Sequence, residues 1–295
     1  MDYGHALEFG LFITPTAERT AKVIELAELA EALGLDLVAI QDHPYQRRFL
    51  DTWTLLTAIG ARTRSIRLTP DVASLPMRPP VMLAKSAASL DLITGGRLEL
   101  GLGAGAFWDA IAGAGGPRRT PKEAVDALVE AIAILRGFWA GGTFSFRGEH
   151  YQVPGTKAGP VPAHPIGIWL GAYGPRMLRV TGQQADGWLP SLGSRDPAGL
   201  AAMNAQIDEA AADAGRDPKA VRRLVNISGS FGNSAELLQG SPADWGEQLA
   251  DLALAFGMSI FILGTDDPHQ ARRYAEEVAP RVRELVAAER APSSS

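Results

Sequence analysis

Two residues with acid and base chemistry stand together at the end of a mostly apolar stretch. Asp42 and His43 follow residues 35–40. Burying such a pair is costly unless both side chains find partners, and histidine is the side chain best suited to exchange protons near neutral pH. Pro44 favours an extended backbone at His43. The pair predicts an acid–base centre, with a helix-capping aspartate beside a structural histidine as the alternative.

A glycine-rich turn suited to an anion lies at residues 171–176, which read Gly-Ala-Tyr-Gly-Pro-Arg. Gly171 and Gly174 let the backbone come close to a ligand, and Pro175 suits the first position of a helix. A helix start offers free N–H groups and a partial positive charge, to which Arg176 adds a full charge. The turn predicts a phosphate site, and the alternative is an ordinary strand-to-helix turn.

A third segment combines small residues with aromatic ones. Gly103 and Gly105 leave space around the backbone, and Phe107 and Trp108 can form a wall for a flat ligand. Asp109 follows directly and is a candidate acid or base, although a single aspartate in a loop is usually solvated.

Several other kinds of chemistry lack the residues they need. The 295 residues include no cysteine, which excludes disulfides, thiolate catalysis, zinc–cysteine sites and iron–sulfur clusters. The five histidines show no metal-ligand spacing, and none of the five lysines follows a predicted strand, which disfavours a metal-dependent hydrolase and a Schiff-base aldolase. No Gly-x-Ser-x-Gly elbow is present. A site without strong nucleophiles or metals favours a cofactor that does the chemistry.

Charge and hydropathy limit the partners. The chain has 28 basic and 33 acidic residues, a net charge of −5, and no long run of one sign. This composition predicts neither a nucleic-acid surface nor a membrane anchor. Residues 1–6 carry no signal-peptide pattern, and the longest apolar run, 252–263, is too short to span a bilayer. We expect a cytoplasmic protein with one domain over residues 1–290 and a disordered tail at 291–295.

The elements that must position these residues alternate between strand and helix patterns. The predicted strands are residues 9–13, 35–40, 65–68, 97–102, 166–170, 187–189, 224–227 and 259–263. The predicted helices are residues 18–33, 52–61, 80–92, 121–139, 175–185, 197–214, 243–256 and 268–289. Residues 144–146 and 150–153 flank Arg-Gly-Glu and predict a small inserted hairpin.

Eight strand–helix units predict an α/β fold, the (β/α)8 TIM barrel. The alternative is an open doubly wound sheet, which the absence of Gly-x-Gly-x-x-Gly after the first strand disfavours. In such barrels the site is built at the carboxyl ends of the strands. The acid–base pair, the segment 69–76, the segment 103–109 and the turn 171–176 all follow predicted strands, so we expect them to meet at one mouth.

Several short motifs, in order, resemble the luciferase-like flavin-dependent oxidoreductases, the family of bacterial luciferase. The similar segments are residues 9–13, 41–43, 95–105, 146–151, 169–172 and 185–188. The most specific is Gly95-Gly-Arg-Leu-Glu-Leu-Gly-Leu-Gly-Ala-Gly105. The likeness covers residues 9 to about 190 and extends more loosely over the rest.

The resemblance implies a barrel that binds FMN or the deazaflavin coenzyme F420. It implies a bulge with a non-proline cis peptide under the ring, around Val72, Ala73 and Ser74. It places the phosphate on Gly171, Ala172, Tyr173, Gly174 and Arg176, and adds Asp42, Gly103, Gly105 and Pro175 to the cofactor site. His43 matches the acid–base histidine of deazaflavin relatives. Their glutamate after strand four is missing here, with Asp109 the nearest carboxylate, which leaves the proton donor open.

Two activities follow from this resemblance. With F420, the enzyme would transfer a hydride to or from a small organic substrate, and His43 would move the proton. With reduced FMN from a partner reductase, it would oxygenate the substrate in a dry pocket. We favour F420, because the turn at Gly103 and Gly105 and the loop 110–119 would admit a long charged tail. Arg118 and Arg119 would meet its carboxylates, unless they are solvated.

Two other functions stay open at this point: a non-catalytic flavin-binding barrel, and a phosphate-binding lyase or isomerase barrel. Relatives pair through the second and third helices, so we also expect a homodimer. The apolar residues of these two helices are Leu55, Leu56, Ile59, Met82, Leu83, Ala87 and Leu90, which would otherwise only cover the barrel.

Overall fold

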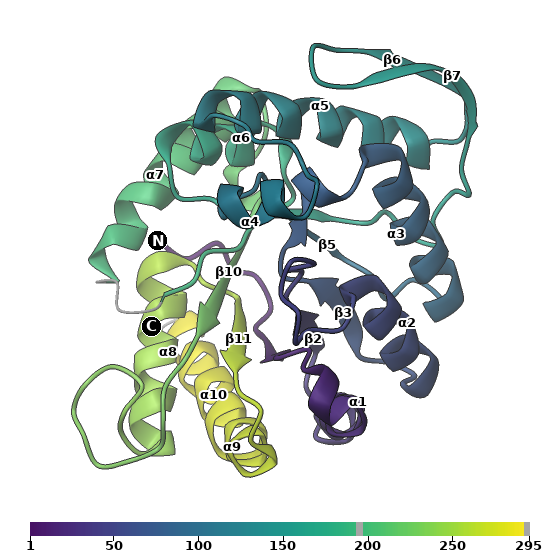
Figure 1. Ribbon diagram of the computed structural model, residues 1–295. Helices are drawn as coiled ribbons and strands as arrows, with labels where there is room; N and C mark the ends of the chain where they lie inside the picture. The colour runs from purple at the N-terminus through teal and green to yellow at the C-terminus, as the bar shows by residue number, and fades with distance from the viewer. Residues whose placement is uncertain (193–196, 292–295) are drawn as a thin grey trace.

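The computed structural model describes residues 1–192 and 197–291, and its centre is a parallel β-barrel surrounded by helices (Figure 1). The barrel strands are β1 Glu8–Ile13, β2 Leu37–Ile40, β3 Arg67–Pro70, β4 Ala73–Ser74, β5 Leu100–Gly103, β8 Ile168–Leu170, β9 Gly187–Trp188, β10 Arg222–Ile227 and β11 Ile260–Gly264. Their order in the sheet is β3-β2-β1-β11-β10-β9-β8-β5-β4, and every pairing is parallel.

The two ends of this sheet meet. Strand β4 continues β3 after a bulge and pairs with β5, and a bridge joins Leu68 of β3 to Leu98, just before β5. With β3 and β4 counted as one, the described residues form eight barrel strands. The predicted (β/α)8 TIM barrel is confirmed.

The strand residues are apolar on both faces because both faces are buried, as is usual for parallel sheets. In β2, Leu37 and Ala39 belong to a cluster inside the barrel, while Val38 and Ile40 belong to the larger core under the helices. Trp169 of β8 also belongs to the inner cluster. The barrel is therefore filled, and its interior supports a site at one end.

The helices surround the barrel (Figure 1). They are α1 Thr20–Ala32, α2 Thr52–Arg62, α3 Pro80–Thr94, α4 Trp108–Gly113, α5 Pro121–Trp139, α6 Pro175–Gln184, α7 Ala198–Asp213, α8 Pro242–Phe256, α9 Pro268–Arg273 and α10 Ala279–Arg290. Helix α5 has the predicted bounds, and Thr120 and Glu123 form a capping box at its start. The short helix α4 lies in a predicted loop. The predicted helix 268–289 is interrupted by a π-helical turn at Tyr274–Val278.

The predicted hairpin is present as β6 Gly142–Arg147 and β7 Gln152–Ala158, and it projects beside α5 (Figure 1). The carboxylate of Glu130 on α5 accepts hydrogen bonds from the backbone N–H groups of Glu149, His150 and Tyr151 at 2.6–3.0 Å. The hairpin is thus attached to a helix and leaves the mouth of the barrel free.

The apolar faces predicted for the second and third helices mostly cover the barrel. Leu55, Leu56 and Ile59 of α2 are buried, as are Leu83, Ala87 and Leu90 of α3, whereas Met82 is 59% exposed. In the described part of the chain, no helix is both long enough and apolar enough to span a bilayer. Of the predicted tail 291–295, the last four residues lie outside the described residues.

Candidate active site

A cavity of about 750 Å³ opens at the carboxyl ends of the barrel strands. Its lining residues come from the ends of β1, β2, β3, β5, β9, β10 and β11, the bulge with β4, helix α4, and the turn that leads into α6. This volume lies in the range of small-molecule and cofactor sites. The segments that the sequence predicts to meet at one mouth do meet there.

The floor of the cavity is the bulge between β3 and β4, where Val72 points toward neighbouring glycines. A Cβ atom on Gly103 would lie 2.6 Å from a methyl of Val72, and one on Gly101 would lie 2.1 Å from the carbonyl oxygen of Pro70. Gly171 also faces Val72. These glycines therefore make room for the bulge and keep the floor flat, which suits a planar ring system.

The bulge contains the expected non-proline cis peptide, one bond earlier than the predicted segment. It joins Asp71 to Val72, whereas the sequence predicts it around residues 72–74. Val72, Ala73 and Ser74 line the cavity as predicted.

Asp42 lies just after β2, and several hydrogen-bond donors compensate the negative charge of its carboxylate. Its carboxylate accepts from Nε and Nη2 of Arg78, each at 2.7 Å, and from the backbone N–H of Ser74 at 2.9 Å. Arg78 also donates to Asp51, the N-cap of α2, at 2.7 Å. Asp42 lines the cavity as predicted, but its hydrogen bonds fix the bulge and are not made to the ring of His43.

His43 lines the cavity and is oriented by a neighbouring tyrosine. Its Nδ1 lies 2.7 Å from the hydroxyl of Tyr45, and the ring of Phe107 contacts it edge-on at a centroid distance of 5.5 Å. Burial lowers the pKa of His43, while the charge of Asp42 acts in the opposite direction. The imidazole is therefore neutral near pH 7. When its Nδ1–H donates to Tyr45, Nε2 has a lone pair and can accept a proton.

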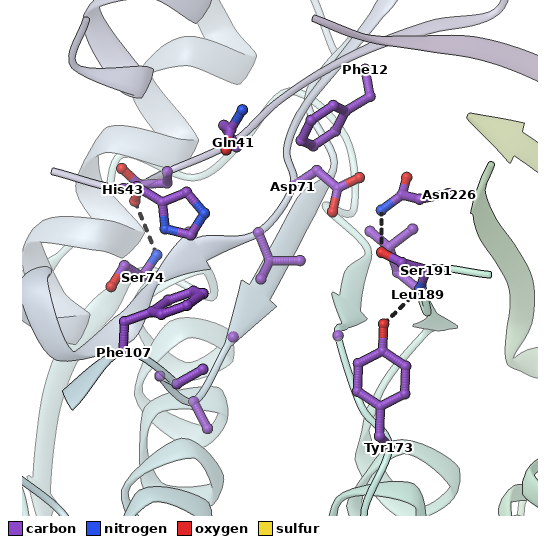
Figure 2. Close-up of a pocket in the computed structure, with 18 of the residues that line it drawn as sticks. Phe12, Gln41, His43, Asp71, Ser74, Phe107, Tyr173, Leu189, Ser191 and Asn226 are labelled. Atoms are coloured by element: carbon purple, nitrogen blue, oxygen red, sulfur yellow. Dashed lines mark hydrogen bonds between the residues drawn. The ribbon is translucent and has the colours of Figure 1, made fainter. Parts of the chain in front are cut away.

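Asp71 is a site residue that the sequence reasoning did not single out. It lies between β3 and β4, lines the cavity, and faces Asn226 of β10 (Figure 2). Burial raises the pKa of its carboxyl to about 7, although a hydrogen bond from the Asn226 side chain lowers it. The sequence places the segment 69–76 at the mouth, but a single acid in it carries no spacing signal.

The turn after β8 contributes to the cavity largely as predicted. Gly171, Tyr173 and Gly174 line it, and a Cβ atom on Gly174 would meet nothing within 4 Å, so there is open space beside this backbone. Ala172 is buried, and its carbonyl oxygen accepts from the indole of Trp188 at 2.9 Å. The hydroxyl of Tyr173 accepts from the backbone N–H of Ser191 at 2.7 Å (Figure 2).

Arg176 points away from this cavity, contrary to the prediction. Its guanidinium forms an ion pair with Asp126 of α5 and donates to the carbonyl oxygen of Lys122 at 3.0 Å. Pro175 is the first residue of α6 and is also outside the cavity lining, which includes Met177 instead. An anion at this turn would be bound by backbone N–H groups and not by the Arg176 side chain.

The structure does not bring Asp109 into the cavity. Its side chain is 97% exposed and forms an ion pair with Arg118 at the rim. Of its neighbours, Phe107 lines the cavity as predicted, while the ring of Trp108 packs over Gly105. Arg119 stacks on the ring of Tyr151 at 5.4 Å. Neither Arg118 nor Arg119 lines the cavity.

The site thus combines a flat floor, an open anion-binding turn and two groups that can exchange protons near neutral pH, His43 and Asp71. The floor and the volume fit a planar tricyclic cofactor, and the turn suits its phosphate. Near pH 7 His43 is suited to accept a proton and Asp71 to release one.

Comparisons with known proteins agree with this geometry. A family model described as luciferase-like monooxygenase matches residues 1–290. The F420-dependent glucose-6-phosphate dehydrogenase of Mycolicibacterium smegmatis is 30% identical over 290 residues, which cover 93% of this chain and 84% of that protein. The enzyme of the same name from Nocardia farcinica is 29% identical over 248 residues, covering 81% of this chain and 73% of that protein.

Solved structures share the fold at lower identity. An F420-dependent secondary alcohol dehydrogenase in complex with an F420–acetone adduct superposes with a TM-score of 0.81 at 18% identity, covering 94% of this chain and 99% of that one. The oxygenating constituent of 3,6-diketocamphane monooxygenase from Pseudomonas putida, in complex with FMN, superposes with a TM-score of 0.78 at 18% identity, covering 94% and 99%.

Proposed function

As a member of the luciferase-like monooxygenase family, this chain is an oxidoreductase that uses F420 or FMN, and we propose that its cofactor is F420. It transfers a hydride between F420 and a carbon of a small organic substrate. Two named relatives at about 30% identity are F420-dependent, which supports this choice. Family membership supports this reaction over the phosphate-binding lyase or isomerase alternatives.

The observation that carries the proposal is the neutral His43 in the wall of the cavity. Oxidation of an alcohol by hydride transfer also requires a base for the hydroxyl proton, and reduction of a carbonyl requires the matching acid. His43, oriented through Nδ1 by Tyr45, offers Nε2 for this proton. An oxygenating site depends mostly on excluding water and has less need of such a group.

The residues that would hold the cofactor are those of the floor and the turn. Val72, with Gly103 and Gly171 beside it, would support the ring system. The backbone of Gly174 and the start of α6 would bind the phosphate. When bound, F420 supplies the hydride chemistry, and the chain supplies orientation and proton transfer.

The lining of the cavity also indicates the class of substrate. Among the described residues that line it, there is no lysine or arginine, while Phe12, Phe107, Ile111 and Leu189 give it apolar walls. A sugar phosphate would need a cationic partner for its second charge. We therefore propose a neutral alcohol or carbonyl compound as the substrate. A separate F420 or flavin reductase would return the cofactor to its starting redox state.

Titration of the purified protein with F420 and with FMN, each in both redox states, tests the cofactor. We expect F420 to bind at micromolar concentration and FMN at least ten-fold more weakly, followed by fluorescence. Gly103→Val, which places side-chain atoms against Val72, is the matched control and should weaken F420 binding. Tighter binding of FMN, with oxygen-dependent turnover of reduced FMN, would instead make the chain a monooxygenase.

Turnover with a panel of neutral alcohols, and with glucose 6-phosphate for comparison, tests the substrate class. The expected result is alcohol-dependent reduction of F420 under anaerobic conditions and at least a hundred-fold lower kcat/KM for the sugar phosphate. A preference for the phosphorylated substrate would contradict the proposal of a neutral ligand.

We also propose a homodimer that pairs through α3. Large apolar side chains remain exposed on this helix and on a neighbouring loop, namely Met82, Leu92, Ile93 and Val161. Lys85 of α3 donates to the carbonyl oxygen of Gly159 at 3.3 Å, so the loop lies beside the helix. Light scattering should give twice the mass of the chain for the wild type. The double variant with Met82→Glu and Ile93→Glu should give the mass of a single chain.

A further inference from the structure

Two carboxylates at neighbouring strand ends of the cavity have opposite surroundings. Asp42 accepts two hydrogen bonds from Arg78 and one from the backbone of Ser74. Asp71, in contrast, is 9% exposed, and its Oδ2 has no hydrogen-bond partner among the described residues. One acid of the cavity is thus compensated by the fold, and the other is not.

The group that faces Asp71 does not supply the missing charge. Figure 2 shows the side chain of Asn226 opposite the carboxyl, with its Nδ2 directed to the hydroxyl of Ser191 at 3.5 Å. The Oδ1 of Asn226 is also buried without a partner in the described structure. The neutral amide of Asn226 lowers the pKa of Asp71 by hydrogen bonding but leaves Oδ2 without a donor, and a buried carboxyl oxygen without a donor is better satisfied when it carries a proton.

No cation is available to take the place of that proton. The other titratable groups in the described lining of the cavity are Asp42, His43, Tyr45 and Tyr173. Of these, Asp42 is already neutralised by Arg78, and Arg78 is shared with Asp51. The carboxyl of Asp71 is therefore best satisfied as a neutral acid, and a pKa raised by burial to about 7 agrees with this geometry.

We propose that Asp71 is the second proton-carrying group of the reaction and that its Oδ2 proton is the one exchanged with the bound cofactor. This inference rests on the proposed F420-dependent function. In the oxidising direction, the substrate carbon gives up a hydride and its hydroxyl gives a proton to Nε2 of His43. Bound F420 would accept the hydride with its two electrons, and Asp71 would supply the accompanying proton from Oδ2. Asp71 is left as a carboxylate, His43 becomes a cation, and solvent restores both.

This assignment answers the question that the sequence leaves open. The family resemblance offers Asp109 as the nearest carboxylate after strand four, but that side chain is 97% exposed at the rim and paired with Arg118. Asp71 reaches the cavity from the preceding strand end. An acid and a base whose surroundings displace their pKa values in opposite directions are the expected signature of a proton-transfer pair.

The test compares Asp71→Asn with Asp109→Asn in the F420-loaded enzyme. Asparagine keeps the size of the side chain but cannot release a proton. For Asp71→Asn we expect kcat to fall about 100-fold while the Kd for F420 changes less than three-fold. In the wild type, kcat/KM in the oxidising direction should fall as the pH rises through about 7, and this alkaline limb should disappear in Asp71→Asn but not in Asp109→Asn. Retention of the limb in Asp71→Asn would overturn the proposal.

Infrared difference spectra of the cofactor-free protein provide a second readout that does not depend on turnover. At pH 6, the wild type minus Asp71→Asn should show the carbonyl band of a protonated carboxyl, and this band should be lost by pH 8. If this carbonyl band is absent at pH 6, the inference is overturned. This holds even when the variant is too unstable for kinetic measurements. Failure of the wild type to bind F420 would overturn the proposed function as well, whereas F420 turnover with an unchanged pH profile in Asp71→Asn overturns only the role of Asp71.

Discussion

The two ends of the barrel treat buried charge in opposite ways. At the amino-terminal end of the strands, Arg67 forms ion pairs with Glu8 and Glu99. Arg222 pairs with Glu8 at 3.3 Å, and Glu99 also accepts from the backbone N–H of Gly167 at 2.7 Å. Each of these four charged side chains has an opposite charge beside it.

At the carboxyl-terminal end, the fold leaves polar atoms without protein partners. Asp71 and Asn226 each bury an oxygen that has no hydrogen-bond donor in the described structure, and His43 is neutral within an aromatic wall. Folding alone thus completes the amino-terminal end, whereas the carboxyl-terminal end leaves polar atoms for a ligand to satisfy. This division agrees with the general use of the two faces of such barrels, one for stability and one for catalysis.

At the carboxyl-terminal end, replacement of His43 should have the largest effect on activity. For His43→Asn we expect the single-turnover rate of F420 reduction to fall about 1000-fold, because no other side chain among the described lining residues is a neutral base for the substrate proton. F420 affinity and the melting temperature should stay near wild type. Tyr45→Phe, which removes only the hydroxyl at Nδ1, is the matched control and should lose about ten-fold. An unchanged rate in His43→Asn would remove this residue from the mechanism.

The uncompensated carboxyl of Asp71, at the same end, should make the free energy of unfolding depend on pH. The pKa of Asp71 rises from 3.8 to about 7 in the folded protein, so the folded state binds the proton more tightly than the unfolded state. The resulting stabilisation is fully present below about pH 4 and is lost as the pH rises through 7. Relative to the wild type, Asp71→Asn should gain on the order of 4 kcal/mol in free energy of unfolding between pH 4 and pH 8.

Urea unfolding of both proteins across this pH range measures the difference. Two parallel stability curves would show that Asp71 is ionised in the folded protein.

Disruption of the ion pairs at the amino-terminal end of the barrel should affect stability and not turnover. Arg67→Met leaves Glu8 and Glu99 without their shared cation, and loss of one partner of a largely buried ion pair costs about 3 kcal/mol. We expect a lower free energy of unfolding in urea and a kcat within two-fold of wild type. A large loss of kcat without a change in stability would show that the two ends are coupled.

The smallest effect is expected at the rim. Asp109→Asn changes a side chain that is almost fully exposed and paired only with another exposed residue, so kcat should change less than two-fold. A ten-fold loss in steady-state assays would place this carboxylate in the reaction after all.

Local sequence signals account for most of the fold. Helix α5 has the predicted bounds because Thr120, Pro121 and Glu123 form a complete start signal. The β3 and β5 strands begin two or three residues later than predicted, because the first residues of each predicted segment precede the hydrogen-bonded ladder. Helix α4 was missed because six residues are too few to show a helical period.

The site was predictable only where a residue's role is set by its own neighbours in the chain. His43 and the glycines of the turn after β8 fall in the cavity as expected. The direction of Arg176 depends on Asp126, 50 residues earlier on another helix. The role of Asp71 depends on Asn226 across the barrel. Such long-range pairs leave no local pattern in the sequence.

The firm attachment of the floor has a consequence for protein engineering. Asp42 and Arg78 join the end of β2 to the bulge and to the start of α2, whereas the rim consists of the short helix α4 and the partly exposed rings of Tyr45 and Phe107. Libraries that vary the rim alone can therefore redirect the enzyme to new compounds without disturbing the cofactor platform. We expect residue 107, whose side chain is 59% exposed, to tolerate the widest range of replacements.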